Sequence, residues 1–494
     1  MEWSKLERTN RPNFVFFVAD QLRADALGHL NPRGAATPWA DALAGEGVSF
    51  QNAYCQNPVC VPSRCSMLTG WYPHTKGHRT MHFLLDEDDP TMLEQLKSNG
   101  YEVIWAGKDE VIPLSRDFGK YCDRYDPGAY PWDRDKSRQF EAQFRGDPSG
   151  GNYYSFYAGE VKPELLDDND RSCVDYSLRY LGEWGKKAAG ERRPFCLFLC
   201  LSNPHPPYGC VRPWYGRTDR SGLPPRRPAP ENWDEMPAML KGIYEKQGLQ
   251  GWSEEQFAEL KGTYYDMVSQ LDDRLGQIIA ALKNSGAYDE TALFYFSDHG
   301  DFTGDYGLVE KAQNTFYDCQ CNVPLIIKPP RSQACRPRVT AALAELVDIP
   351  ATVAEMAGFS LDYTQFGRSL CPVLAGDNVH RDAVFCEGGR IHGEQQAMER
   401  GHGPDSLYWP RLSTQCLEGP EHTKAVMARE QRYKYVYRLY EDDQLFDLEE
   451  DPQELVNLAK LPEYRETALR LQQRILRFLV ETGDFVPNRK DKGY

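Results

Sequence analysis

The chain has 494 residues and a formal net charge of -16, which argues against nucleic acid as a partner because phosphate binding needs a net basic face. With 41% hydrophobic and 26% charged residues, it has the composition of a soluble globular protein, long enough for one large α/β domain with an appendage. No apolar run reaches the roughly 18–20 residues that span a bilayer. Residues 1–8 form no apolar signal segment, so we expect a cytoplasmic protein without a membrane partner.

The first two-thirds of the chain alternates apolar strands with helical patterns. Strands are predicted at 14–19, 48–50, 101–105 and 292–296. Helices are predicted at 38–44 with Thr37 as N-cap, at 91–96, within 254–284 and from 348 onward. Residues 110–160 and 204–230 look irregular. The alternation indicates an α/β fold with a large, mostly parallel sheet sandwiched by helices.

After about residue 376 the pattern changes. Short strands are predicted at 383–386, 424–428 and 433–437, followed by an amphipathic helix at 464–482. Short strands of this kind are typical of a smaller antiparallel α+β subdomain. We therefore predict two domains, residues 1–375 and residues 376–494.

Fourteen cysteines are scattered along the chain, and several lie in apolar runs, such as Cys196 and Cys200. The absence of a CxxC pair argues against a zinc ribbon or a thioredoxin-like motif. We expect most of these residues to be buried, reduced thiols.

Two of the predicted strands end in clusters of oxygen- and nitrogen-bearing side chains. Asp20 and Gln21 follow the strand at 14–19, and Asp298 and His299 follow the strand at 292–296. Ligands collect at the carboxyl ends of strands in open α/β sheets. These side chains suit a hard cation such as Ca²⁺ or Mg²⁺, and the histidine leaves Mn²⁺ open. Each aspartate alone has an alternative role as a helix N-cap or loop residue.

The segment Cys60-Val61-Pro62-Ser63-Arg64 lies between these clusters in the chain. Alone, a Cys-x-Pro-x-Arg match is weak evidence, and an ordinary buried cysteine is the alternative. Together with both carboxylate clusters, it indicates one metal-centred active site into which a single cysteine is delivered.

These motifs resemble the type I sulfatase family, which has an alkaline-phosphatase-like fold. The resemblance spans nearly the whole chain and rests on the segments 13–21, 60–64, 66–70, 100–108, 297–300 and 444–454. The Asp-Gln and Asp-His pairs resemble two subsets of that family. One comprises bacterial uronate 2-O-sulfatases of glycosaminoglycan degradation, and the other comprises phosphonate and phosphate monoester hydrolases.

The resemblance implies that Cys60 is converted to Cα-formylglycine by a formylglycine-generating or anaerobic sulfatase-maturating enzyme that reads Pro62 and Arg64. The hydrated aldehyde is a geminal diol, in which one oxygen attacks sulfur and the second hydroxyl lets the covalent sulfate be expelled. The resemblance also implies one divalent cation, Ca²⁺ ahead of Mg²⁺ or Mn²⁺. Its implied ligands are Asp20, Gln21, Cys60, Asp298 and His299.

Four more side chains acquire roles from the resemblance. Arg64 holds the formylglycine and neutralises charge, and Lys108 stabilises the sulfuryl oxygens. His205 and Lys311 bind the sulfate and protonate the leaving group, and the sequence leaves open which of them supplies the proton. Taken singly, each such Lys or His is more often a surface residue or a satisfied core group.

The chain departs from the family pattern in two places. Many relatives have Asp-Asp where this chain has Asp20-Gln21, so one negative ligand is missing and the metal becomes a stronger Lewis acid. Relatives often carry Gly-Lys-x-His, whereas here Glu110 occupies the place of the histidine. That histidine is either absent or supplied elsewhere, with His78 and His82 as candidates.

The sequence therefore predicts a bacterial sulfatase that hydrolyses a sulfate ester on a small saccharide from glycosaminoglycan or mucin breakdown. Residues 1–375 form its catalytic domain, and residues 376–494 complete the substrate pocket. A phosphonate or phosphate mono- or diester hydrolase with the same nucleophile is one alternative, and a non-catalytic, metal-stabilised binding protein is another. The oligomeric state stays open. The candidate substrate contacts are His78, Arg79, His82, His392 and His422.

Overall fold

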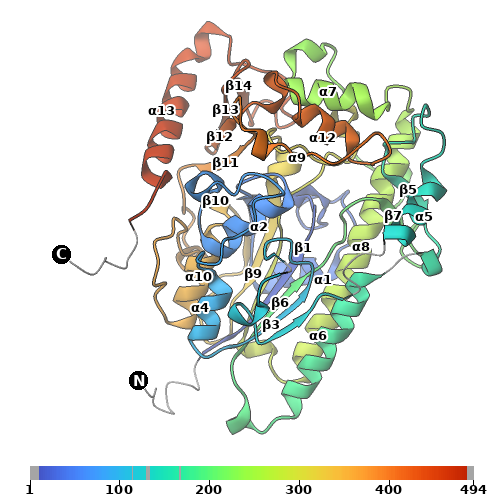
Figure 1. Ribbon diagram of the computed structural model, residues 1–494. Helices are drawn as coiled ribbons and strands as arrows, with labels where there is room; N and C mark the ends of the chain where they lie inside the picture. The colour runs from blue at the N-terminus through green and yellow to red at the C-terminus, as the bar shows by residue number, and fades with distance from the viewer. Residues whose placement is uncertain (1–10, 114, 129–133, 166–167, 487–494) are drawn as a thin grey trace.

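The core of the protein is a large twisted sheet between two layers of helices (Figure 1). The computed structural model describes residues 11–113, 115–128, 134–165 and 168–486. Within these residues the sheet has eight strands in the order β10-β2-β9-β8-β1-β6-β3-β4. Only β9 runs antiparallel to its neighbours, so the mostly parallel sheet is confirmed. The strands are β1 (Asn13–Ala19), β2 (Val48–Tyr54), β3 (Glu102–Gly107), β4 (Arg124–Asp126), β6 (Phe195–Cys200), β8 (Thr291–Ser297), β9 (Asn322–Lys328) and β10 (Arg338–Glu345).

Strand β1 lies in the middle of this sheet and is buried on both faces, as its unbroken apolar run requires. Alternate side chains enter two separate cores. Phe14, Phe16 and Val18 join one core, and Val15 and Phe17 join the other. The first core packs under α2 (Cys60–Thr69), α4 (Met92–Ser98) and α10 (Asp348–Ala357), and the second under α1 (Pro38–Glu46), α6 (Asn169–Lys186) and α8 (Glu254–Asn284).

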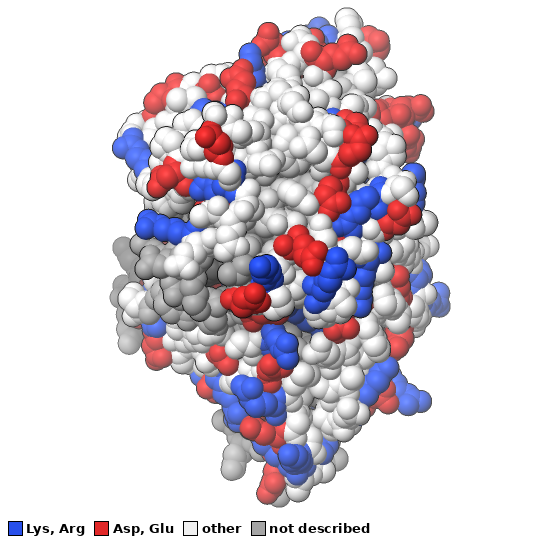
Figure 2. Space-filling model, turned by 90° about the vertical axis from the view of Figure 1, so that its right-hand side faces the viewer, with Lys and Arg blue, Asp and Glu red and all other residues white. Residues whose placement is uncertain are grey.

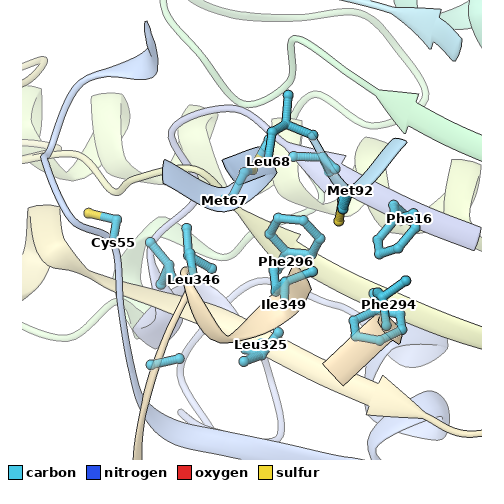
Figure 3. Packing of buried hydrophobic residues seen from close by; sticks show 14 of the residues in the cluster. Phe16, Cys55, Met67, Leu68, Met92, Phe294, Phe296, Leu325, Leu346 and Ile349 are labelled. Atoms are coloured by element: carbon cyan, nitrogen blue, oxygen red, sulfur yellow. The ribbon is translucent and has the colours of Figure 1, made fainter. Parts of the chain in front are cut away.

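Figure 3 shows the first of these cores at close range. Phe16, Phe294 and Phe296 extend from the sheet toward Met67 and Met92 of the covering helices. Burying large apolar side chains in this way is the main favourable term in folding, worth about 1.5–3 kcal/mol for each fully buried residue. This packing fixes the helix that carries Cys60 against the sheet.

The predicted N-cap of α1 is confirmed at Thr37, but the Thr37 side chain does not cap the helix. The Thr37 hydroxyl donates a hydrogen bond to Asp41 and makes no capping bond to the helix backbone. The first free N–H groups of α1 are satisfied by Asp272 of α8, whose carboxylate accepts from Trp39 N (3.0 Å) and Ala40 N (2.8 Å). The cap is therefore a tertiary contact from a residue more than 200 positions away.

The region 110–160 was expected to be irregular, yet it contains the helix α5 (Arg134–Phe144). This helix is strongly polar, so its sequence lacks the apolar stripe by which buried helices are usually found. A short strand in the same region, β5 (Tyr157–Glu160), pairs in parallel with β7 (Tyr208–Cys210). The remaining helices are α3 (Pro73–Lys76), α7 (Ala238–Gln247), α9 (Asp318–Cys321), α11 (Cys371–Ala375), α12 (Trp409–Gln415) and α13 (Arg465–Thr482).

A second, smaller sheet lies near the carboxyl end of the chain, as predicted. It has the order β11-β12-β13-β14 and is antiparallel throughout. Helix α13 covers one of its faces through Leu471, Ile475 and Phe478. The domain boundary at 375/376, which falls between α11 and β11, stays a prediction. The strands are β11 (Val384–Gly388), β12 (Ala425–Arg429), β13 (Tyr433–Arg438) and β14 (Gln444–Asp447).

A buried lysine joins the small sheet to the rest of the protein. Lys434 of β13 is fully buried, and its ammonium group donates to Phe316 O (2.9 Å), Asp318 Oδ1 (2.5 Å) and Glu454 Oε1 (2.5 Å). We expect Lys434→Met to destabilise the fold by about 3–5 kcal/mol, because it leaves two carboxylates in the interior without their cation. Chemical denaturation measures this loss. Lys460→Met is the matched control, since the Lys460 pair with Asp442 is exposed, and no measurable change is expected there.

No helix among the described residues combines the length and apolarity that a membrane crossing needs. On the face drawn in Figure 2, Lys and Arg side chains are interleaved with Asp and Glu, so this face offers no broad basic surface for nucleic acid. The cytoplasmic location stays a prediction.

Candidate active site

The candidate site lies at one edge of the large sheet. Strands β1, β3, β6 and β8 run parallel, so their carboxyl ends meet at that edge. Asp20, Lys108 and Asp298 follow β1, β3 and β8 directly, and His205 comes five residues after β6. Strand β2 has the same direction, and the chain leaving it leads to the first residue of α2, Cys60.

Cys60 and three other predicted residues gather at this edge. Cys60 Sγ lies 3.2 Å from His299 Nε2 and 3.7 Å from Asp20 Oδ1. His299 Nε2 lies 3.7 Å from both Asp20 Oδ1 and Asp298 Oδ1. All four residues are at most 1% exposed. Segments that are up to 279 positions apart in the chain thus form one compact polar cluster in the interior.

The orientation of the His299 ring fits a cation at this cluster. Its Nδ1 donates to Gly300 O (2.9 Å), which leaves Nε2 as an acceptor beside the Cys60 sulfur. Burial lowers the pKa of His299, which favours the neutral ring. The Nε2 lone pair therefore lies close to the oxygens of Asp20 and Asp298, and these three acceptors converge beside residue 60. Two carboxylates and one imidazole are a donor set for Ca²⁺, Mg²⁺ or Mn²⁺.

Gln21 is held in a strained conformation beside this cluster. Its φ angle is 65°, in the left-handed region that residues other than glycine rarely adopt. Its backbone N–H donates to Asp298 Oδ1 (3.1 Å), and its side-chain Oε1 accepts from Lys311 Nζ (2.6 Å). The Gln21 amide nitrogen donates to Asp301 Oδ2 (2.5 Å), so the oxygen of the amide is turned toward Lys311.

Asp301 is a functional candidate that the sequence reasoning missed. It is fully buried and accepts hydrogen bonds from the Tyr208 hydroxyl, from Thr303 and from Gln21. Since a carboxylate only accepts, it fixes which end of the Gln21 amide faces it. The available signal was its position two residues after His299, in the same acidic stretch.

We expect Asp301→Asn to lower the cation affinity and kcat/KM by about 10–100-fold, the usual effect of losing a residue that orients a metal ligand. The new amide presents N–H groups to the Gln21 amide nitrogen, so the Gln21 side chain flips or turns away. Calorimetric cation titration and sulfate-release kinetics measure both quantities. Thr303→Ala is the control, because it removes one donor to Asp301 but keeps the acceptor that faces Gln21. Equal losses in both variants would contradict this orienting role.

Helix α2 delivers two residues to the site on one face. Cys60 is its first residue, and Arg64 lies one turn later on the same side. The Arg64 guanidinium donates from Nη2 to Asp20 Oδ2 (3.0 Å) and from Nε to Asp298 Oδ2 (2.8 Å), and the residue is 1% exposed. Ser63 donates to Asp298 O (2.6 Å) and ties the helix to the loop after β8. Arg64 thus joins the two carboxylates whose other oxygens face the cysteine.

The two predicted lysines flank this cluster. Lys108 Nζ donates to Asp20 Oδ2 (2.6 Å) and lies 3.0 Å from Glu110 Oε1. Lys311 Nζ lies 3.5 Å from Cys60 Sγ. Burial and the Asp20 carboxylate raise the pKa of the Cys60 thiol. A thiol at this position is therefore a weak nucleophile.

His205 is near the same groups but bonds to none of them. It is partly exposed, and its Nδ1 donates to Pro206 O (2.7 Å), which leaves Nε2 as an acceptor. Burial and the Lys311 ammonium group lower the pKa of His205, so the ring is neutral at pH 7.

Two of the predicted substrate contacts, His78 and Arg79, bind other groups of the protein. His78 is buried, and its two ring nitrogens contact Phe83 O and Asp89 Oδ2 (3.1 Å each), so it has no free nitrogen for a substrate. Arg79 holds Gly389 O (2.9 Å) and Glu394 Oε1 (2.6 Å).

The other three predicted contacts are histidines. His82 is exposed. His392 and His422 stand together, with ring centroids 4.8 Å apart, beside Glu418.

Two residues near the cluster were not singled out from the sequence. Arg411 is buried and pairs with Glu310 Oε2 (3.1 Å), next to Lys311 in the chain. Tyr408 directly precedes α12, and burial raises the pKa of its phenol. Both residues come from the segment around α12, so the C-terminal part of the chain reaches the site.

Comparison with known proteins identifies the fold and the family. Residues 12–359 match the family described as Sulfatase. The chain belongs to the sulfatase family. Sulfatases of this family are hydrolases within the alkaline phosphatase superfamily, so this sulfatase hydrolyses sulfate esters.

Individual relatives are distant and have different names. The sulfatase is 28% identical to the choline-sulfatase of Rhizobium meliloti over 471 residues, covering 92% of this chain and 83% of that protein. It is 25% identical to the Delta 4,5-hexuronate-2-O-sulfatase of Bacteroides thetaiotaomicron, covering 92% and 86% of the two chains. Its fold superposes on the phosphonate monoester hydrolase of Agrobacterium radiobacter with a TM-score of 0.72 and 22% identity, covering 96% of each chain.

The alkaline-phosphatase-like fold and the family predicted from the motifs are thus confirmed. The family implies a metal and a formylglycine, and the buried cluster of Asp20, Cys60, Asp298 and His299 suits a metal ion.

Proposed function

We propose that this sulfatase removes sulfate from a small saccharide derived from glycosaminoglycan or mucin. The observation that carries the proposal is the Asp20-Gln21 pair, in which the Gln21 amide oxygen is turned toward Lys311. The same pair marks the resemblance to uronate 2-O-sulfatases, and a hexuronate-2-O-sulfatase is among the relatives.

Around the nucleophile, we assign Asp20, Gln21, Asp298, His299 and residue 60 to one divalent cation. Ca²⁺ is the first candidate, with Mg²⁺ and Mn²⁺ as alternatives. When bound, the cation supplies positive charge next to residue 60 and makes its oxygen more acidic.

Cys60 is proposed to act as formylglycine, which supplies a geminal diol in place of the thiol. The maturing enzyme, of the formylglycine-generating or the anaerobic type, acts on this residue before folding is complete. The reason is that every residue of α2 is buried in the folded protein.

Two lysine ammonium groups and one neutral histidine ring are proposed to bind the sulfate group of the substrate. Lys108 stabilises the sulfuryl oxygens as charge develops on them. Lys311 and His205 bind the sulfate, and one of them protonates the leaving oxygen. Arg64 bridges Asp20 and Asp298 and balances part of their negative charge.

The sugar itself is proposed to contact the C-terminal segment. Tyr408 precedes α12, whose Arg411 pairs with Glu310 beside Lys311, and aromatic rings commonly stack on sugar faces. Arg79, His82, His392 and His422 stay candidates for contacts farther from the sulfate. His78 is not proposed, because its ring is fully engaged within the fold.

A panel of sulfate esters tests the proposal. The enzyme carrying formylglycine at residue 60 is incubated with saccharides sulfated at defined positions, and with choline sulfate, an aryl sulfate and an aryl phosphonate. We expect the highest kcat/KM for one sulfated saccharide. A higher value for choline sulfate or for the aryl phosphonate would replace the saccharide by that substrate class. Peptide mass analysis confirms beforehand that residue 60 is converted.

A further inference from the structure

Three cysteines that have no role in the sulfatase site meet in the interior. Cys55 follows β2, Cys321 is the last residue of α9 just before β9, and Cys386 lies within β11. Their sulfur atoms lie within 4.8 Å of one another, and all three side chains are at most 1% exposed. Cys55 and Cys321 are next to the ends of two strands of the large sheet, and Cys386 lies in the small sheet. The cluster therefore lies where the two sheets join.

The backbone holds these three positions in place. Cys55 N donates to Cys321 O (3.0 Å), and Glu387 N donates to Gln56 O (2.9 Å). The second bond fixes the residue after Cys386 against the residue after Cys55. The three thiols are thus convergent because of the sheet geometry and do not depend on flexible side chains or loops.

The spacing of the sulfurs matches that of ligands around one ion. Three sulfurs at a metal–sulfur distance of about 2.3 Å in a plane lie about 4.0 Å apart. The Cys321 and Cys386 sulfurs lie 3.6 Å apart, and all three sulfurs lie within 4.8 Å of one another. Small side-chain rotations therefore bring all three sulfurs to one ion without moving the backbone.

The surroundings favour a soft ion of low charge. The cluster lies within the first hydrophobic core, and Met427, which pairs with Cys386 across β11 and β12, adds a thioether to the same face. Among the described residues, no histidine, carboxylate or fourth cysteine completes the cluster. Zn²⁺ in structural sites takes four ligands, whereas thiolates and thioethers also select Cu(I). A monovalent ion also costs less to bury than a divalent one.

We propose that Cys55, Cys321 and Cys386 form a trigonal site for one Cu(I) ion, separate from the sulfatase centre. Binding forms three copper–sulfur bonds, and each thiol that becomes a thiolate releases one proton to solvent. No electrons move, because copper enters and stays as Cu(I). The bound ion links the large sheet to the small sheet five residues before Cys60, so it stabilises the junction on which the nucleophile helix rests.

The test is an anaerobic copper titration of the full-length protein in which Cys60→Ala removes the active-site thiol. Cu(I) is supplied as its complex with a coloured chelator, and the copper that the protein withdraws is counted. We expect one tightly held equivalent and a higher unfolding temperature with copper, since a ligand that binds only the folded state stabilises it. Cys55→Ala or Cys386→Ala added to this background should abolish both effects. Cys196→Ala, another buried cysteine of the same core, should leave both unchanged.

X-ray absorption spectroscopy of the copper-loaded Cys60→Ala protein identifies the atoms bound to copper, and it needs no further variant. We expect a first shell of three sulfurs and no oxygen or nitrogen. A shell of nitrogen and oxygen, or copper retention that survives both Cys55→Ala and Cys386→Ala, would overturn the proposal. So would a copper equivalent that leaves the unfolding temperature unchanged.

Discussion

Replacing Cys60 by alanine is expected to lower sulfate release by a factor of about 10⁶, the size of loss seen when a covalent nucleophile is removed from an enzyme. The physical reason is local. Cys60 is the residue at which Asp20, Asp298, His299 and Lys311 converge, and alanine offers no atom that attacks sulfur. Sulfate release from the best saccharide of the panel, measured at saturating substrate, gives the change in kcat.

The control for this experiment lies on the same helix. Cys65 is also buried in α2 but packs into the first hydrophobic core. Cys65→Ala is therefore expected to reduce stability by creating a cavity while leaving kcat within a few-fold. Unfolding midpoints separate the two effects. If Cys60→Ala kept more than a tenth of the wild-type rate, residue 60 would not be the nucleophile, and the proposed role of its modification would fail with it.

The fold was largely predictable because its signal is local. The apolar run at 14–19 predicts a doubly buried strand, and β1 is observed at Asn13–Ala19 with both faces covered. Likewise the strand predicted at 292–296 is observed as β8, one residue longer at each end. The helix α5 was missed for the converse reason, since its residues are polar and its pattern carries no core-facing stripe.

The site residues could be predicted only where they directly follow a predicted strand or match a motif of the family. Asp20, Gln21, Asp298 and His299 each follow a strand, so the direction of parallel strands brings them together. The role of Asp301 was hidden, because the amide orientation it imposes on Gln21 depends on side-chain hydrogen bonds across 280 positions.

Contacts between distant segments were equally hidden. Asp272 caps α1 from α8, and Cys386 meets Cys55 across the junction of two sheets. No periodicity or motif in the sequence marks these residues. The helix or strand that contains each of them is predicted equally well whether or not the distant contact exists. Such contacts become visible only when the fold is known.

Asp298→Asn is expected to abolish cation retention and with it most of the activity. The Asp298 carboxylate accepts from Gln21 N, His299 N and Arg64 Nε, so all its partners are donors. An amide of the same shape puts an NH₂ group among them and removes one of the two negative charges at the cluster. The metal content after dialysis, measured by elemental analysis, is expected to fall from one equivalent to none.

The control for Asp298→Asn is the same substitution at Asp348, a buried carboxylate outside the cluster with similar hydrogen-bond partners. Asp348 is also fully buried, accepts from the backbone N–H of Glu345 (3.0 Å) and Arg368 (2.8 Å), and pairs with Arg381. Asp348→Asn is expected to cost similar stability but to keep the cation, because Asp348 does not belong to the cluster. If both variants retained one equivalent, the cation would not depend on Asp298, and the charge next to residue 60 would have to come from Lys108 and Lys311 alone.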